Sequence, residues 1–233
     1  MHTPFLVSSI ASGARFFAPG AALRGTALRS LAACLLGIAL TGCGTSSANR
    51  PVVYDFGPGA TQPAISNRAA PLPTVVLAEL ESSIALEGNA VLYRLAYADA
   101  QQLRPYAQAR WSMPPAQLLR QRVRELLGQR RSVLSQPDAA AAGTLVLRLE
   151  LEEFSHYFES AQRSSGLVRV RATLSRTGTP AKPVAQTSLV VQRASRSADA
   201  AGGVQALAEA GDAVVTQLDA WLQQVAAAEP TTP

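Results

Sequence analysis

The segment LVLRLELEE, residues 145–153, decides the fold class, because leucine alternates in it with polar and charged residues. Successive side chains of an extended strand point to opposite faces of a sheet, so this pattern predicts one apolar and one wet face. Glu150 and Glu152 fall on the wet face. The consecutive acids Glu152 and Glu153 break the alternation, which predicts a β-bulge at this point.

Further strands are predicted on both sides of this segment. Downstream, Val168–Leu174 repeats the alternation, and Val184–Arg193 follows a turn rich in glycine and proline. Upstream, extended patterns predict strands at Val52–Phe56, Thr74–Leu80, Asn89–Ala98 and Arg104–Trp111. A sheet with one apolar and one wet face is typical of antiparallel strands.

Two amphipathic helices complete the predicted layout. Pro115–Gln129 places apolar residues at helical spacing behind a proline pair that suits a first turn, and Asp199–Ala227 carries a longer apolar stripe. The order of elements predicts an α+β fold, a two-layer sandwich of a mostly antiparallel sheet with both helices packed on one face. We expect one domain at residues 53–227, irregular connections at 57–73 and 136–143, and a disordered tail at 228–233.

The first 42 residues read as a targeting signal. Three arginines precede the apolar run Leu31–Leu40, which is too short to span a membrane, and no acidic residue occurs before Asp55. The sequence Leu40-Thr41-Gly42-Cys43 then resembles the lipobox of bacterial lipoproteins. That resemblance implies cleavage before Cys43, a diacylglycerol on its thiol and an acyl chain on its new amino group. The alternative is a plain secretory signal with a chance cysteine near its end.

The predicted anchor also carries an expectation about location. Residues 43–52 would form a short lipidated tether, and acylation at one residue by several chains holds a protein on a membrane far more firmly than one chain does. Gly44 stands where aspartate would signal retention in the inner membrane. We therefore expect the outer membrane, with the domain facing the periplasm.

Charge and composition argue against nucleic acid as a partner. The chain has 21 basic and 16 acidic residues, but three of the basic ones lie in the signal, which leaves 18 against 16. No block of arginines with interleaved aromatics appears. Arg122, Arg124, Arg130 and Arg131 form the densest group, which we interpret as the solvated face and end of a helix; the alternative is a patch for anionic lipid headgroups.

The residues available for catalysis are few. Cys34 would leave with the signal and Cys43 would be acylated, so no disulfide is expected. His156 is the only histidine after residue 42, and no nucleophile-elbow, phosphate-loop or zinc-protease motif occurs. We interpret His156 as a half-buried strand residue rather than a metal ligand or general base. The sequence predicts a protein that is not an enzyme and holds no metal or cofactor; a periplasmic hydrolase would have to use His156.

A longer pattern resembles a known family. Aromatic and apolar residues follow one another in a fixed order, at Tyr93-Arg94-Leu95-Ala96-Tyr97, Leu103, Pro105-Tyr106, Trp111, Pro114-Pro115 and Leu118-Leu119, with Tyr54 and Phe56 upstream. This order after a lipobox resembles the ABC-type transport auxiliary lipoproteins, the family that includes paraquat-inducible protein C. The resemblance implies a non-enzymatic accessory of transporters with MCE (mammalian cell entry) domains, which move lipids between the inner and outer membranes. Of the family's functional positions, it carries over only Cys43.

The aromatic residues of that pattern are candidates for contact with a partner or a lipid. Tyr93, Tyr97, Tyr106 and Trp111 could equally belong to the core and the sheet edge, and core packing is the more common role. A partner with an MCE domain and a homo-oligomer are both compatible with the resemblance. The alternative function is that of a structural or assembly lipoprotein in another cell-envelope complex.

Overall fold

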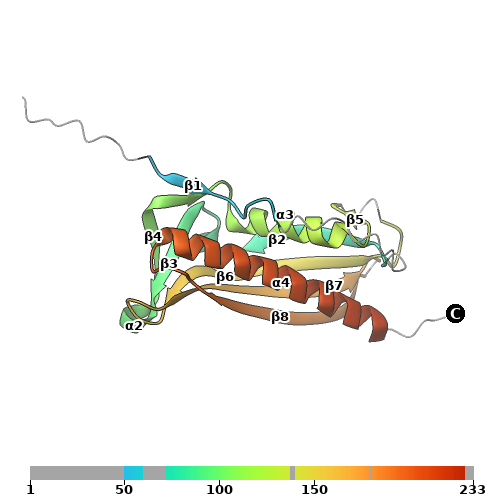
Figure 1. Cartoon of the computed structure of the whole chain (residues 1–233). Coiled ribbons are helices and arrows are strands. Elements are labelled where there is room, and N and C mark those ends of the chain that lie inside the picture. Colours follow the sequence, from blue (N-terminus) through green and yellow to red (C-terminus); the bar gives the residue numbers. More distant parts are fainter. Residues whose placement is uncertain (1–49, 60–71, 137–139, 179, 229–233) are drawn as a thin grey trace, which may run out of the picture. The chain divides into compact units, whose positions relative to one another are not determined.

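A sheet built on the alternating segments forms one layer of the molecule (Figure 1). The structure is a computed structural model that describes residues 50–59, 72–136, 140–178 and 180–228. The predicted signal peptide at 1–42, Cys43, most of the connection at 57–73 and the end of the tail lie outside the described residues. The described residues belong to one compact unit, 50–233.

The three longest strands of the sheet form an antiparallel meander. They are β6 (Leu145–Phe158), β7 (Ser164–Arg176) and β8 (Lys182–Ala194). The leucines of the opening segment are buried on one face of β6, and the register of β6 against β7 shifts between Leu151 and Glu153. The predicted bulge is therefore confirmed. Glu150 and Glu152 lie beside Arg171 of β7, on the face away from the core.

Two further strands follow one another along the other edge of β6. β2 (Val75–Ser82) pairs with its first half and β3 (Ala90–Leu95) with its end, both parallel to it, with the 3-10 turn η1 (Ile84–Leu86) between them. The two-residue strand β5 (Val133–Leu134) pairs parallel with β2. β2 and β3 thus behave as one long strand interrupted by a turn.

The remaining strands extend the sheet beyond β3. A single helical turn, α2 (Ala96–Asp99), reverses the chain into β4 (Ala100–Trp111), which is antiparallel to β3. β1 (Val52–Tyr54) then pairs parallel with the end of β4. The described residues form eight strands in all.

The sheet is mixed, so the prediction of a mostly antiparallel sheet is wrong. Of the seven strand pairings that the described residues make, four are parallel: β1 with β4, β2 with β5, β2 with β6 and β3 with β6. Alternation of side chains shows which face of a strand is buried, but not the direction in which its neighbour runs. Helix α3 lies in the crossover that joins β2 and β3 to their parallel neighbour β6.

Both long helices lie on one face of the sheet, as predicted (Figure 1). α3 (Pro115–Gly128) packs on β2 and α4 (Ala200–Ala228) packs across β6, β7 and β8. One apolar core fills the space between the layers. A Cβ on Gly166 of β7 would lie 2.4 Å from the backbone of Ala206, so a glycine is required where α4 crosses the sheet most closely.

Candidate functional site

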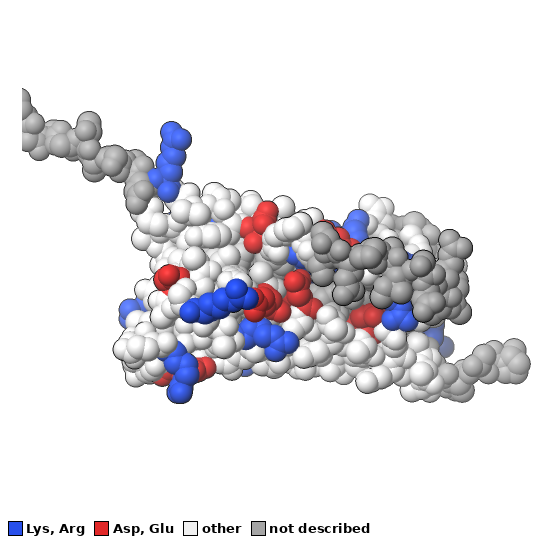
Figure 2. All heavy atoms as spheres, in the orientation of Figure 1, with Lys and Arg blue, Asp and Glu red and all other residues white. Residues whose placement is uncertain are grey.

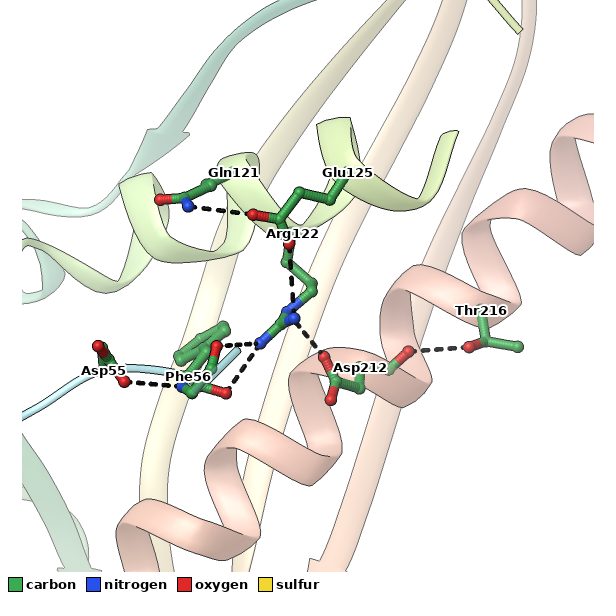
Figure 3. A network of polar contacts seen from close by, with 8 residues as sticks. Asp55, Phe56, Gln121, Arg122, Glu125, Asp212 and Thr216 are labelled. Carbon is green, nitrogen blue, oxygen red and sulfur yellow. Dashed lines mark hydrogen bonds and ion pairs between the residues drawn. The ribbon is translucent and has the colours of Figure 1, made fainter. Parts of the chain in front are cut away.

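The chain that leaves β1 is fastened to both helices by one arginine (Figure 3). The Arg122 guanidinium of α3 donates through Nη2 to the carbonyl oxygens of Phe56, at 2.8 Å, and of Gly57, at 3.1 Å. Its Nε lies 3.0 Å from the Asp212 carboxylate of α4, and Nη1 lies 3.5 Å from the Glu125 carboxylate. We call Phe56, Gly57, Arg122 and Asp212 the latch.

The Phe56 side chain fixes the same segment by packing into the core. Its ring lies 5.7 Å from that of Trp111, edge to face, and 5.9 Å from that of Phe154, stacked. A Cβ on Gly211 of α4 would lie 3.2 Å from the Phe56 ring, so glycine at 211 leaves room for this aromatic ring beside the helix. Backbone and side chain of Phe56 are therefore both held, and the chain is attached firmly to the domain from β1 onward.

Two cavities flank the latched segment. Both are lined by Asp55, Phe56, Gly57 and Ser112. The first, about 270 Å³, continues to Arg122 and the start of α3. The second is a groove of about 470 Å³ that continues along the first turns of α4 and is lined there by Ala201, Val204, Gln205 and Ala208. The segment after β1 thus separates a more polar cavity from a largely apolar groove.

Opposite charges on α3 and α4 stabilise the latch. Burial raises the pKa of the Asp212 carboxyl, and the positive charge of Arg122 opposes that rise. The interpretation of the arginine group as a solvated face is wrong for two of its members, because Arg122 and Arg131 are buried. The Arg131 guanidinium lies 3.0 Å from the Asp219 carboxylate of α4. This second arginine therefore joins the segment that follows α3 to α4.

A second cluster of polar side chains lies where α4 begins. His156 of β6 is fully buried, so the prediction of a half-buried residue is wrong. Hydrogen bonds join its Nδ1 to the Tyr106 hydroxyl at 2.8 Å and its Nε2 to the Ser195 hydroxyl at 3.0 Å. A Cβ on Gly203 would lie 2.3 Å from His156 Nδ1, so the helix backbone covers the imidazole directly.

Burial sets the protonation of this cluster. It lowers the pKa of His156 to about 4 and raises the pKa of the Tyr106 hydroxyl above its ordinary value. A serine beside a histidine has the geometry of an activated nucleophile. The imidazole is, however, a weak base at neutral pH, and Ser195 lines neither of the two cavities described above. The arrangement instead joins β4, β6 and the chain entering α4 through hydrogen bonds.

The four aromatic residues that were candidates for contact with a partner or a lipid lie in three different surroundings. Tyr93 and Tyr106 are neighbours, with ring centroids 4.6 Å apart, beside the His156 cluster. Trp111 is buried with Phe56 and Phe154 under the latch. Tyr97, on α2, is 52% exposed. The structure therefore brings only Tyr93 and Tyr106 together.

Cys43 lies outside the described residues, so the structure gives no geometry for the predicted lipid attachment. Among the described residues, no helix is long and apolar enough to cross a membrane. The same residues contain no group of three or more histidine, cysteine or acidic side chains that could hold a metal ion.

The latch is a feature that sequence reasoning missed. Arg122 lies on the polar side of a helix in the sequence pattern, and its burial depends on a segment 65 residues upstream and on Asp212 far downstream. The one available signal was Phe56, an aromatic residue directly before the glycine-rich connection.

Comparison with known proteins identifies the family. The family described as ABC-type transport auxiliary lipoprotein component matches residues 54–219. This range is well over half of the chain and contains the latch and the His156 cluster. The chain belongs to this family. The auxiliary lipoprotein is accordingly an envelope protein of the kind that accompanies ABC-type transporters, and the resemblance seen in the sequence is confirmed at this level.

Solved structures share the fold of the auxiliary lipoprotein. A crystal structure of a Xanthomonas campestris protein is 16% identical, with a TM-score of 0.59, and the match covers 79% of this chain and 92% of that one. A second crystal structure, titled as an uncharacterized protein, is 14% identical with a TM-score of 0.55, and the match covers 74% of this chain and 99% of that one. A comparison with curated protein sequences found no match.

Proposed function

We propose that this auxiliary lipoprotein is a non-enzymatic accessory subunit of an MCE-type ABC system that transports lipid between the inner and outer membranes. It would be anchored in the outer membrane through acylated Cys43 and would face the periplasm. The observation that carries the proposal is the family match over residues 54–219. The accessory role needs no metal or cofactor beyond the covalent lipid.

The latch supports a role in which the domain is held at a membrane. A lipid anchor can hold a folded domain in place only if the connecting chain is attached firmly to the domain at the point where it joins it. Here β1 pairs with β4, the Phe56 ring packs against Trp111 and Phe154, and Arg122 donates to the Phe56 carbonyl. Only residues 43–49 would thus separate the lipid from the part of the chain that begins with Arg50 and is fixed to the core.

The His156 cluster supports a structural rather than a catalytic role. Both imidazole nitrogens are engaged by hydroxyl groups, and α4 covers the ring at Gly203. A general base needs a free position toward a substrate and a pKa near the working pH. His156 has neither, which favours a protein that acts by binding.

Co-purification tests the proposal. The full-length lipoprotein with a C-terminal affinity tag is extracted in mild detergent, and the eluate is examined for an MCE-domain subunit. A second lipoprotein with the same signal peptide and tag serves as the control. The proposal requires the subunit in the first eluate and not in the second. Recovery of components of a secretion or pilus machine instead would replace it with the assembly function.

A further inference from the structure

Strand β8 has a free edge. It pairs with β7 on one side, and no strand of the described residues pairs with it on the other side. Its 13 residues make it longer than the other two edge strands, β1 and β5, which have three and two residues. Helix α4 packs over one face of this strand (Figure 1). A row of unpaired backbone N–H and C=O groups of this length is a template for pairing with another strand.

The direction of the backbone groups along this edge follows from one hydrogen bond. Ser195, directly after β8, donates its N–H to the Ser164 carbonyl oxygen at 2.9 Å. In an antiparallel pair the backbone groups of alternate residues point to the same neighbouring strand, and the register of β8 against β7 is regular from Ala185 to Ala194. The residues that point their N–H and C=O groups away from β7 are therefore Gln186, Ser188, Val190 and Gln192.

The features that usually protect an edge strand are confined to the ends of β8. Charged side chains and proline hinder the pairing of an edge with another chain. In β8, Lys182 and Pro183 stand at the start and Arg193 stands near the end. The sequence between them, VAQTSLVVQ at 184–192, contains no charged residue, proline or glycine. Figure 2 shows few charged side chains along the border of the molecule where β8 lies in Figure 1. The middle of the edge is thus neutral and open to pairing.

We propose that the free edge of β8 pairs antiparallel with β8 of a second copy of this protein, which joins the two sheets into one. The occupant is a second copy because antiparallel pairing sets the neutral stretch 184–192 against an identical neutral stretch, so no like charges lie opposite one another. Two-fold pairs, in which both copies use the same surface, are also the commonest homo-oligomers. The inference goes beyond the proposed function and requires neither the acylation of Cys43 nor a transporter.

The register follows from the centre of the neutral stretch, which is Ser188. Pairing about this residue sets Ser188 opposite its counterpart in the second copy, and Gln186 opposite Val190. All three residues direct their backbone groups to the free edge, so each pair exchanges two hydrogen bonds. Lys182 and Arg193 fall outside the paired stretch.

Disulfide formation between copies tests the pairing. The full-length lipoprotein with Ser188→Cys is oxidised in isolated membranes, and the disulfide-linked dimer is measured on a non-reducing gel. Opposite residues of a hydrogen-bonded antiparallel pair have Cα atoms about 5.5 Å apart, which a disulfide can span. Arg169→Cys is the matched control, because Arg169 is exposed on β7 directly opposite Val190. Three strand spacings, about 14 Å, would separate its two copies, which is too far for a disulfide. Protein without an introduced cysteine reports any contribution of Cys43.

Two further positions test the register. Gln186→Cys and Val190→Cys, each produced alone, would lie four residues or about 14 Å from their own counterparts and should give little dimer. Produced together in the same cells, the two variants should link to each other. Ser188→Pro, added to both, removes an outward N–H and no bond to β7, so it should lower the linked fraction several-fold. An unchanged urea midpoint of the proline variant shows that the domain still folds.

The result expected is a several-fold larger linked fraction for Ser188→Cys, and for the mixed 186 and 190 variants, than for Arg169→Cys. Equal linkage at 188 and 169, or no linkage at 188 and in the mixed sample, would overturn the proposal. Linkage of the β8 cysteines to a different protein would also overturn it, because a foreign strand would then occupy the edge. The cysteine positions decide between these outcomes even if the proline variant does not fold.

Discussion

At the scale of single residues, Arg122 holds three parts of the chain that are far apart in sequence. Its guanidinium is planar and carries five donors, which suits it to bind two carbonyl oxygens and a carboxylate at once. Lysine could supply the charge but not this geometry. A nearly buried arginine held by carbonyl oxygens and carboxylates fixes one arrangement of the segments that it joins.

Replacement of Arg122 should therefore destabilise the domain. Arg122→Ala leaves the Asp212 carboxylate without its partner and the Phe56 carbonyl without a donor. We expect the free energy of unfolding to fall by about 2–3 kcal/mol, measured by urea denaturation. Arg124→Ala is the control, because Arg124 is exposed on the same helix, and it should change stability by less than about 0.5 kcal/mol. Equal effects of the two substitutions would contradict the latch.

His156 should give the domain a specific dependence on pH. The pKa of the buried imidazole is about 4, against 6.5 for an ordinary histidine, so the unfolded chain takes up a proton between these values while the folded chain does not. The stability that this group contributes is complete above pH 6.5 and is lost as pH falls toward 4. The loss should be roughly 2–3 kcal/mol.

The matched variant isolates this effect from the titration of the acids. His156→Gln keeps a polar side chain but has no proton to gain in this range. Urea midpoints measured from pH 4 to pH 8 should fall more steeply with decreasing pH for the native protein than for the variant. Parallel curves would show that the imidazole is not held in its neutral form. The comparison uses slopes, so a general loss of stability in the variant does not affect it.

At the scale of elements, the close crossing of α4 over β7 depends on the absence of a side chain at Gly166. A Cβ there would meet the backbone of Ala206 and Leu207, which cannot rotate away. Gly166→Ala should lower stability by about 2–3 kcal/mol through overpacking, seen as a lower melting temperature. Gly128→Ala, near the end of α3 with open space around it, should instead be neutral or stabilising by up to about 1 kcal/mol. A harmless Gly166→Ala would mean that α4 lies further from the sheet.

The same elements show what the sequence could and could not predict. Period-two and helical patterns located the long strands, the bulge at Glu152-Glu153 and both long helices, because these depend on local alternation between apolar and polar residues. Strand direction was not predictable from them, since parallel and antiparallel neighbours can bury the same face. The latch and the His156 cluster were also missed, because each is made by residues that meet only after α4 packs on the sheet.

Small elements escaped prediction for a related reason. The strand β5 has two residues and α2 has four, so neither is long enough to show a period. β5 forms because the chain after α3 runs beside the free edge of β2 and pairs with it. α2 forms because the chain must reverse its direction between the antiparallel strands β3 and β4. Tertiary context, rather than propensity, determines such elements.

At the scale of the whole molecule, the fold attaches the N-terminal chain, which would carry the predicted anchor, firmly to the core. The N-terminal chain enters through β1, is fixed by the latch, and continues into a core shared by the sheet and both helices. Under the proposed acylation of Cys43, a domain connected in this way would be held at the membrane by that residue.

Loss of the cysteine that we propose to be acylated should therefore separate folding from function. Cys43→Ala removes the thiol that would carry the diacylglycerol and leaves the sequence of the compact unit at 50–233 unchanged. We expect the variant to leave the membrane fraction and to keep the urea midpoint of the native domain, because β1, the latch and the core are unchanged. Under the proposed function, lipid transport in cells should fail, since the domain would no longer be held at the outer membrane beside the transport assembly. A variant that stays in the soluble fraction yet fully restores an envelope defect would show that anchoring is dispensable, and the proposed function would then have to be revised to one in which the domain acts freely in the periplasm.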